Sequence, residues 1–219
     1  MKKLILLLAI LLISTSATFA ANTEMNRDAR FVYLGMAAGL DIPSLATTPI
    51  SVGGYLGQHF LVAGEFGIPK TIDFNDSGTG TKANVKYTNM GGYGRWFPGN
   101  SFNVLLGVHQ RNLTLGGTVQ YTDAATGMSA STYVEAKMNA MVATLGIGNQ
   151  WIADFGLTFG VDWFALRSVL SHTESITDSG GFTSLVPSEK DQVLKDMADI
   201  NMLLNSFPGL LIVSVGWAF

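Results

Sequence analysis

Hydrophobic and polar residues alternate along much of the chain, most clearly in residues 209–219. Every second position there is apolar or aromatic, and the positions between them, towards the end, are small. Successive side chains of a β-strand point to opposite faces, so one face of this strand is apolar and the other small or polar. Such a strand is typical of a lipid boundary. The apolar face consists of Leu211, Val213, Val215, Trp217 and Phe219.

Seven further segments predict strands, which gives an even total of eight. Short turns at 58–60, 97–101 and 149–153 alternate with longer connections at 41–48, 75–81 and 122–131, as in a transmembrane barrel with both ends on the periplasmic side. Each segment has about the 9–11 residues that a spanning strand needs, or more. The seven segments are 29–39, 50–57, 61–68, 85–96, about 102–121, about 133–148 and a stretch at 155–163.

The sixth of these strands has an ambiguous phase. Met141 and Leu145 fit one register, whereas Met138 and Val142 fit the other. A β-bulge inserts one extra residue and so changes which face the following side chains occupy. We therefore predict a bulge near residue 140.

The composition supports a barrel. Hydrophobic residues make up 47% of the chain and charged residues only 13%, against roughly 25% charged in an ordinary soluble domain. After residue 20, however, no apolar run approaches the 18 residues of a spanning helix. Only helices and closed barrels satisfy their backbone groups in lipid. We expect one all-β domain over residues 21–219, an eight-stranded antiparallel transmembrane up-and-down β-barrel.

The first 20 residues predict a cleaved secretory signal peptide. Lys2 and Lys3 form a positive head, ten apolar residues follow, and a small, polar stretch ends at Ala20. The alternative is an uncleaved anchor helix, but the apolar core is shorter than the about 20 residues that span a bilayer. The chain has no Cys, which excludes lipidation at the cut, disulfides and thiolate chemistry.

The charge gives no indication of a nucleic-acid partner. Removing Lys2 and Lys3 lowers the formal charge of −3 by two, to −5, and no cluster of five or six basic residues exists.

Ionisable residues are predicted inside the barrel, where side chains just fill the space of an eight-stranded ring. An isolated buried charge is costly, so Glu65 and Asp162 are expected to pair with Arg111. This network is interpreted as a satisfied polar core that holds the barrel shut; the alternative is a narrow ion or small-solute path gated by it. The predicted lumen residues are Tyr33, Glu65, Thr88, His109, Arg111 and Asp162.

Residues 189–204 predict an amphipathic helix in the last external loop. Ser188 can cap it, and Asp191 completes a capping-box pattern. Its apolar stripe must rest on the barrel mouth, the outer-leaflet interface or another protein. We favour a lid on the mouth, because the loop ends are tethered to adjacent strands there. The stripe comprises Val193, Leu194, Met197, Ile200, Leu203 and Leu204.

The strand pattern and the final aromatic residue together resemble the small outer-membrane barrels of the OmpA, OmpX and OmpW type over residues 29–219. The resemblance implies a monomer in the outer membrane, surrounded by its lipid, with a last strand that the barrel-assembly machinery reads. It implies a structural or surface-interaction role; the OmpW resemblance suggests, as an alternative, a narrow channel for small or hydrophobic solutes. The predicted helix departs from this pattern.

Lipid-modifying barrel enzymes are a third class, and they need a nucleophile or base at the membrane boundary. Only His59, His109 and His172 are present, and the His-X-Ser pair of barrel deacylases is missing. His172 with Glu174 and Ser175 is a weak constellation. The three histidines are scattered and no carboxylates have ligand spacing. We therefore expect no enzyme, no metal site and no cofactor.

Overall fold

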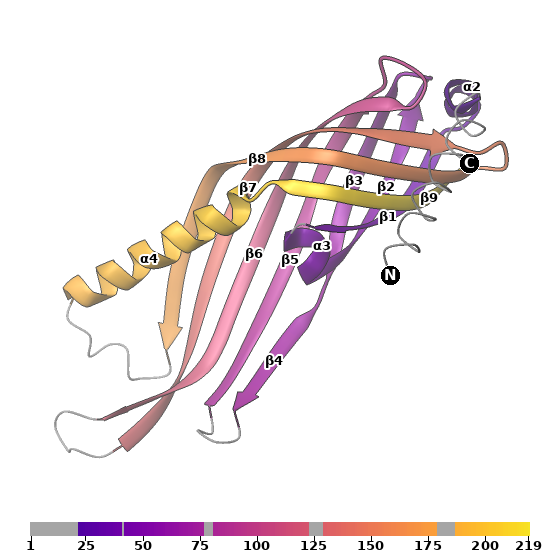
Figure 1. Ribbon diagram of the computed structural model, residues 1–219. Coiled ribbons are helices and arrows are strands. Elements are labelled where there is room, and N and C mark those ends of the chain that lie inside the picture. The colour runs from indigo at the N-terminus through magenta and orange to yellow at the C-terminus, as the bar shows by residue number, and fades with distance from the viewer. Residues whose placement is uncertain (1–21, 41, 77–80, 123–128, 179–186) are drawn as a thin grey trace, which may run out of the picture.

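The computed structural model describes residues 22–40, 42–76, 81–122, 129–178 and 187–219 (Figure 1). The predicted signal peptide, residues 1–20, lies outside this part of the chain. No helix among the described residues is long and apolar enough to cross a membrane. The helices are α2 (Thr23–Asp28), α3 (Ile42–Ala46) and α4 (Pro187–Ser206). The strands are β1 (Val32–Leu40), β2 (Thr47–Leu56), β3 (Phe60–Pro69), β4 (Thr71–Asp76), β5 (Thr81–Trp96), β6 (Phe102–Thr122), β7 (Ser129–Ile152), β8 (Leu157–Asp178) and β9 (Gly209–Ala218).

The strands form a closed antiparallel ring. Apart from β3 and β4, strands that are neighbours in sequence pair with each other, and the pairings of β1 with β9 and of β3 with β5 close the ring. Both β3 and β4 pair with β5, and only Lys70 separates them. Together they therefore act as one interrupted strand of the wall. The ring therefore has eight strands, which confirms the predicted up-and-down barrel. The closure reaches the last residue, because the backbone N–H of Phe219 donates to the Val32 carbonyl (2.9 Å).

The wall is apolar on its outside, as the alternation predicts. The last strand is typical: Leu211, Val215, Trp217 and Phe219 are exposed and Val213 is partly exposed, whereas Ser214 and Ala218 are buried. A continuous outward face of this kind suits a hydrocarbon environment. Other exposed apolar side chains of the wall include Val32, Leu34, Met36, Val62, Phe66, Ile68, Met90, Leu106, Val108, Leu145 and Ile147.

A charge on this outer face should destabilise the barrel. Leu106 is 63% exposed on β6, near the middle of the apolar band. We expect Leu106→Arg to lower the free energy of unfolding by about 2–4 kcal/mol in bilayers, because the guanidinium would face hydrocarbon. Leu106→Phe keeps the face apolar and should change it little. Equal unfolding curves for the two variants would contradict a lipid-facing position.

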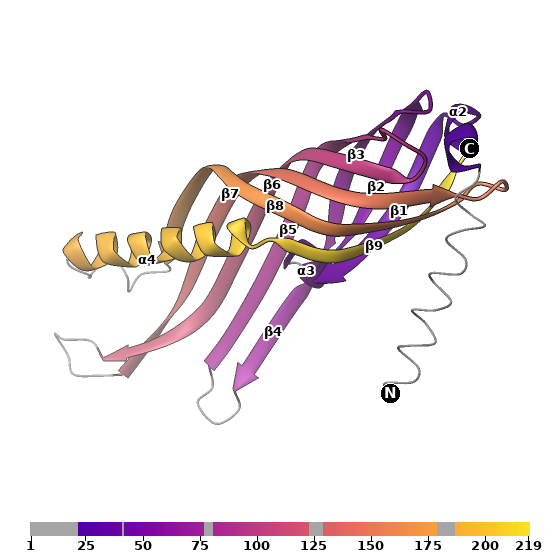
Figure 2. The same cartoon turned by 45° about the horizontal axis from the view of Figure 1, so that its top comes forward.

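The strands differ greatly in length, and this makes the wall uneven. β6, β7 and β8 have 21, 24 and 22 residues, whereas β1 has 9 and β2, β3 and β9 have 10 each. At about 3.3 Å per residue, the long strands extend roughly 70–80 Å and the short ones about 30 Å. The ring thus closes only at one end, beside α2 and the C-terminus, and the long strands continue from it as a curved sheet (Figures 1 and 2).

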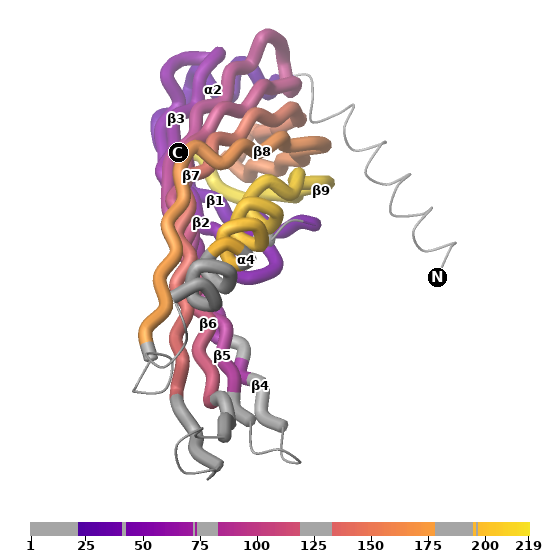
Figure 3. Tube along the Cα trace, turned by 90° about the vertical axis from the view of Figure 1, so that its left-hand side faces the viewer, coloured from indigo at the N-terminus to yellow at the C-terminus, as the bar shows by residue number. Residues whose placement is uncertain are grey.

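Helix α4 lies beside this curved sheet, beyond the end at which β9 begins (Figure 3). It packs on β8 and β7. Its residue range includes the whole of the predicted helix 189–204. The predicted apolar stripe is only partly correct: Met197 is buried and Leu204 half-buried, but Ile200 and Leu203 are 50% and 69% exposed. Asn201 and Asn205 occupy the buried face instead. Asn201 Nδ2 donates to the Asn139 carbonyl and to Glu174 on the wall, and Asn205 Nδ2 donates to Asn201 Oδ1 within the helix.

Several predicted boundaries differ from the structure. α2 was not predicted, and α3 lies in the predicted loop 41–48. The predicted turn 149–153 is strand up to Ile152. The chain reverses at 153–156, where Gly156 has a φ of 104°, a conformation that glycine adopts at little cost.

The predicted bulge near residue 140 of the sixth strand is wrong, since β7 keeps one register with β6 from end to end. The register shift opposite Met141 and Val142 lies on β8, whose extra residue is Leu170. Met138 and Val142 accordingly face inward and Met141 outward in a single phase. The bulge belongs to the partner strand, whose sequence alternates too loosely there to reveal it.

Candidate functional site

The barrel interior is crossed by an ion pair between Arg95 of β5 and Asp162 of β8. The two guanidinium nitrogens donate to the two carboxylate oxygens at 2.5 and 2.7 Å. Arg95 Nη1 also donates to Asn103 Oδ1 (2.8 Å). All three side chains are nearly inaccessible to solvent. A two-pronged arginine–carboxylate contact is both strong and geometrically specific, so it fixes the distance between opposite parts of the wall.

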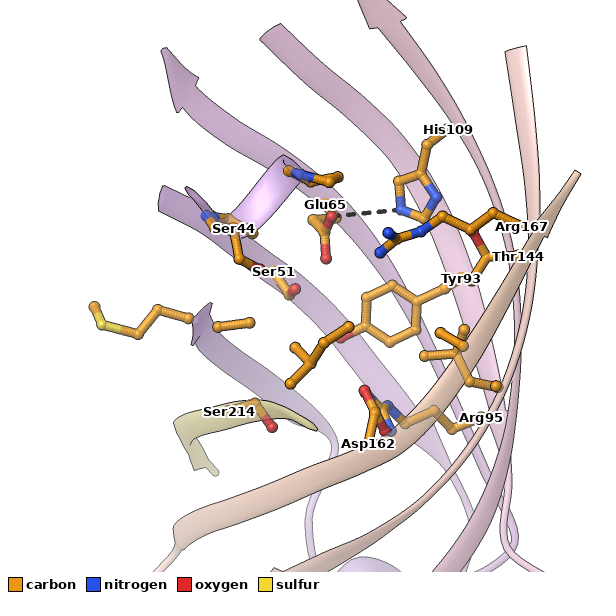
Figure 4. Close-up of a pocket in the computed structure, with 18 of the residues that line it drawn as sticks. Ser44, Ser51, Glu65, Tyr93, Arg95, His109, Thr144, Asp162, Arg167 and Ser214 are labelled. Carbon is orange, nitrogen blue, oxygen red and sulfur yellow. Dashed lines mark hydrogen bonds and ion pairs between the residues drawn. The ribbon is translucent and has the colours of Figure 1, made fainter. Parts of the chain in front are cut away.

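A second polar group lies above this pair, towards the open end of the barrel. Glu65 of β3 lies 3.5 Å from His109 Nε2 of β6, and it accepts a hydrogen bond from Asn89 Nδ2 of β5 (2.9 Å). Figure 4 shows Glu65 and His109 pointing toward one another. Gly91 makes room for this contact, because a Cβ at that inward position would lie 2.7 Å from His109 Cδ2.

Two arginines hold the C-terminal end of α4 against the barrel. Arg111 Nη1 of β6 donates to the Asn205 carbonyl (3.4 Å), and Arg167 Nη1 of β8 donates to the Phe207 carbonyl (3.1 Å). Cations are favourable at a helix C-terminus, where carbonyl groups remain without partners inside the helix. Asn201 adds a hydrogen bond to Glu174 Oε1 of β8 (2.7 Å).

The predicted lumen residues are therefore divided between three places. Glu65 and His109 meet, Asp162 pairs with Arg95 instead of Arg111, and Arg111 contacts α4. Tyr33 is buried inside the barrel. Thr88 was wrongly assigned to the lumen, since it shares its phase with the exposed Lys86 and Met90.

Arg95 was missed, although the sequence contains a signal for it. Tyr93 and Arg95 alternate with Gly94 and Trp96, which places the large aromatic Trp96 outward and Arg95 inward. Its partner was harder to find, because contacts across a barrel depend on how the strands are staggered.

A small polar void of about 70 Å³ separates these groups (Figure 4). It has room for a few water molecules, each needing about 10–15 Å³ or more on this measure. Towards the closed end of the ring the void gives way to a tight layer of buried side chains, Tyr33, Tyr55, Leu61, Phe97, Leu105 and Ile152.

Helix α2 closes the barrel at that end. Arg27 is fully buried and donates to the carbonyls of Gln58 (2.6 Å), Asn100 (2.5 Å) and Gly99 (3.1 Å). Its guanidinium lies 4.1 Å from the centre of the Phe97 ring. Burial lowers the pKa of Arg27 to about 10, so the side chain stays charged at neutral pH and its hydrogen bonds are charge-assisted.

The structure does not bring His172, Glu174 and Ser175 together as a catalytic group. His172 Nδ1 lies 3.0 Å from Glu174 Oε1. Both residues pair with inward positions of β7, whereas Ser175 pairs with Lys137 in the opposite phase. Adjacent strand residues point to opposite faces, so Ser175 is directed away from the other two. His59 lies at the closed end of the ring, where Nδ1 is 3.1 Å from the Phe97 carbonyl. Within the described residues, no three His, Asp or Glu side chains are grouped to hold a metal ion.

Solved structures that are similar to this chain include three bacterial proteins. CarO and CarO2 of Acinetobacter baumannii are 12% and 11% identical, cover 88% and 87% of this chain and 99% of their own, and give TM-scores of 0.48 and 0.49. Ail, the attachment invasion locus protein of Yersinia pestis, was solved with the heparin analogue sucrose octasulfate; it is 8% identical, covers 86% of this chain and 94% of its own, and gives 0.42. CarO and Ail are small eight-stranded outer-membrane barrels.

This chain has the eight-stranded barrel fold. Its own strand pairing establishes that, independently of the three likenesses. No protein-family model and no curated protein matches the sequence.

Proposed function

We propose that this protein is a monomeric outer-membrane barrel with a closed lumen, acting in a structural or surface-interaction role. The observation that carries the proposal is the obstructed interior. The Arg95–Asp162 pair crosses it, a layer around Leu61, Phe97 and Ile152 fills it, and α2 covers its end. A path through the barrel would need all three to separate.

The apolar outer face supports a location in a membrane with lipid as the surrounding medium. Delivery by the signal peptide and insertion by the barrel-assembly machinery, which would read Leu211, Val213, Val215, Trp217 and Phe219, belong to the same proposal. A monomer is favoured because the paired ring offers no free strand edge over its closed part, so a second copy has no edge there to extend.

Planar-bilayer recordings test the closed lumen. The purified barrel should give no stable single-channel steps at neutral pH, whereas a known porin prepared in the same detergent should give them. A heat-modifiability gel on the same sample verifies folding, because folded barrels migrate differently until boiled. Reproducible steps from the folded protein would overturn the proposal.

The second candidate function is a narrow path for small solutes, gated by the polar groups. The void of about 70 Å³ favours it, since it places water-sized space beside Glu65, His109 and Arg95. The same recordings decide between the two functions.

A lipid-modifying activity is the third and least supported candidate, because Ser175 is directed away from His172 and Glu174. Mass spectrometry of lipid A from cells with and without the protein should show identical profiles.

A further inference from the structure

A second cavity lies outside the polar lumen, between α4 and the inner face of strands β5 and β6. Its volume is about 290 Å³. Above the level of Arg111, the inward positions of β5 and β6 change from polar to apolar. α4 faces these positions without filling the space. The apolar side chains that line the cavity are Ala46, Val85, Tyr87, Leu113, Leu115, Ile200 and Leu204.

The cavity is partly open to its surroundings, and Ile200, one of the residues that line it, is 50% exposed. Apolar side chains directed into an accessible cavity are unfavourable unless something apolar covers them. A cavity of about 150 Å³ is known to hold benzene, so about 290 Å³ suits one unbranched chain of roughly ten carbons.

An arginine lies at the inner end of the cavity. Arg111 lines both this cavity and the polar void, so the two spaces meet at its side chain. The ionisable groups around the void are three arginines (Arg95, Arg111 and Arg167) and two carboxylates (Glu65 and Asp162), with His109. Among the groups that line the void the arginines outnumber the carboxylates by one, and a third carboxylate, Glu174, is hydrogen-bonded to Asn201 of α4 outside this set. The carbonyl end of α4 offsets roughly half a charge at most.

We propose that this cavity binds a single-chain amphiphile with an anionic head group. The alkyl chain lies between α4 and the Leu113–Leu115 face of β6, and the head group meets Arg111 at the boundary of the void. The site goes beyond the closed-lumen role proposed above, since it requires α4 and the upper wall but no path through the barrel.

Methyl NMR of the folded protein in lipid nanodiscs tests the site, with decanoate as the probe. The Leu113 and Leu115 methyl signals should shift saturably. Those of the lipid-facing Leu106 should follow only the gradual change that partitioning into the bilayer causes. Affinity should rise about three- to fourfold per methylene from hexanoate to decanoate and then stop rising. Uniform, unsaturable shifts at all three leucines would overturn the proposal.

The head-group preference is tested with charge. Decyltrimethylammonium and decanol should bind about tenfold or more weakly than decanoate, and Arg111→Gln should remove that difference. Equal affinity for the anionic and cationic probes would refute the role of Arg111.

Filling the cavity provides a test independent of charge. Leu113→Phe combined with Leu115→Phe should abolish the saturable component, while the matched outward variant Leu106→Phe should retain it. Heat-modifiability verifies that each variant is folded, and the probe series on the unmodified protein decides the question if the double variant does not fold. The absence of channel steps has no bearing on these outcomes, so the site and the closed lumen stand or fall separately.

Discussion

Replacing Arg95 with methionine should lower the free energy of unfolding by about 3–5 kcal/mol, because it leaves the Asp162 carboxylate buried without its counter-charge. Urea unfolding in short-chain phospholipid vesicles, followed by tryptophan fluorescence, measures the change. The loss should exceed that caused by any single charge removed from the exterior. The exposed pair of Lys137 and Glu135 supplies the control, and Lys137→Met should leave the unfolding curve unchanged.

The double variant Arg95→Met with Asp162→Leu separates the energy of the pair from the cost of a lone charge. Replacing both members of a buried pair by apolar residues of similar size is often neutral or stabilising. We therefore expect the double variant to recover most of the lost stability. If it is as unstable as Arg95→Met, the effect comes from lost packing and the ion pair is not its cause.

Replacing Arg27 with alanine should detach α2 and destabilise the barrel by about 4 kcal/mol. Three charge-assisted hydrogen bonds are lost, each contributing about 1.5 kcal/mol or more, and three carbonyls lose a donor. The same unfolding assay measures the stability. Amide hydrogen exchange at Asn26 and Ala29, whose N–H groups bond within α2, should become fast.

Met25 provides the control on the same helix, because its side chain is 70% exposed. Met25→Ala should leave both measurements unchanged. Arg27→Lys should give an intermediate loss, since an ammonium group lacks the fork that reaches three carbonyls at once. Unchanged exchange in Arg27→Ala would show that other contacts, such as those of Asn26, hold α2 in place.

The wall of the barrel could be predicted from sequence because its information is local. A residue on a spanning strand faces lipid or interior according to its phase alone, so the outward faces of β1, β3 and β9 follow from counting. Val62, Phe66 and Ile68 are exposed and Glu65 points inward, as predicted.

The contents of the barrel were predicted less well, because they depend on distances between strands far apart in sequence. Asp162 pairs with Arg95, 67 positions away, and the stagger of the strands selects that partner over Arg111. α2 has six residues, too few to form a stable helix in isolation, and it depends on contacts with the barrel such as those of Arg27 and Asn26. The inward face of α4 was mistaken for a similar reason. Apolar periodicity cannot reveal that Glu174 and the Asn139 carbonyl offer partners to Asn201.

The unequal strands make one side of the open end of the barrel taller than the other. β7 continues 14 residues beyond the length of β9, which is roughly 45 Å along the strand and about 30 Å in height for strands tilted by about 45°. Long strands shield the mouth on one side, while the rim formed by β1, β2 and β9 stays low. In the outer-membrane location proposed above, the long strands would block a macromolecule that approaches from one side, whereas the low rim would admit it from the other. Encounters at the cell surface should therefore be strongly directional.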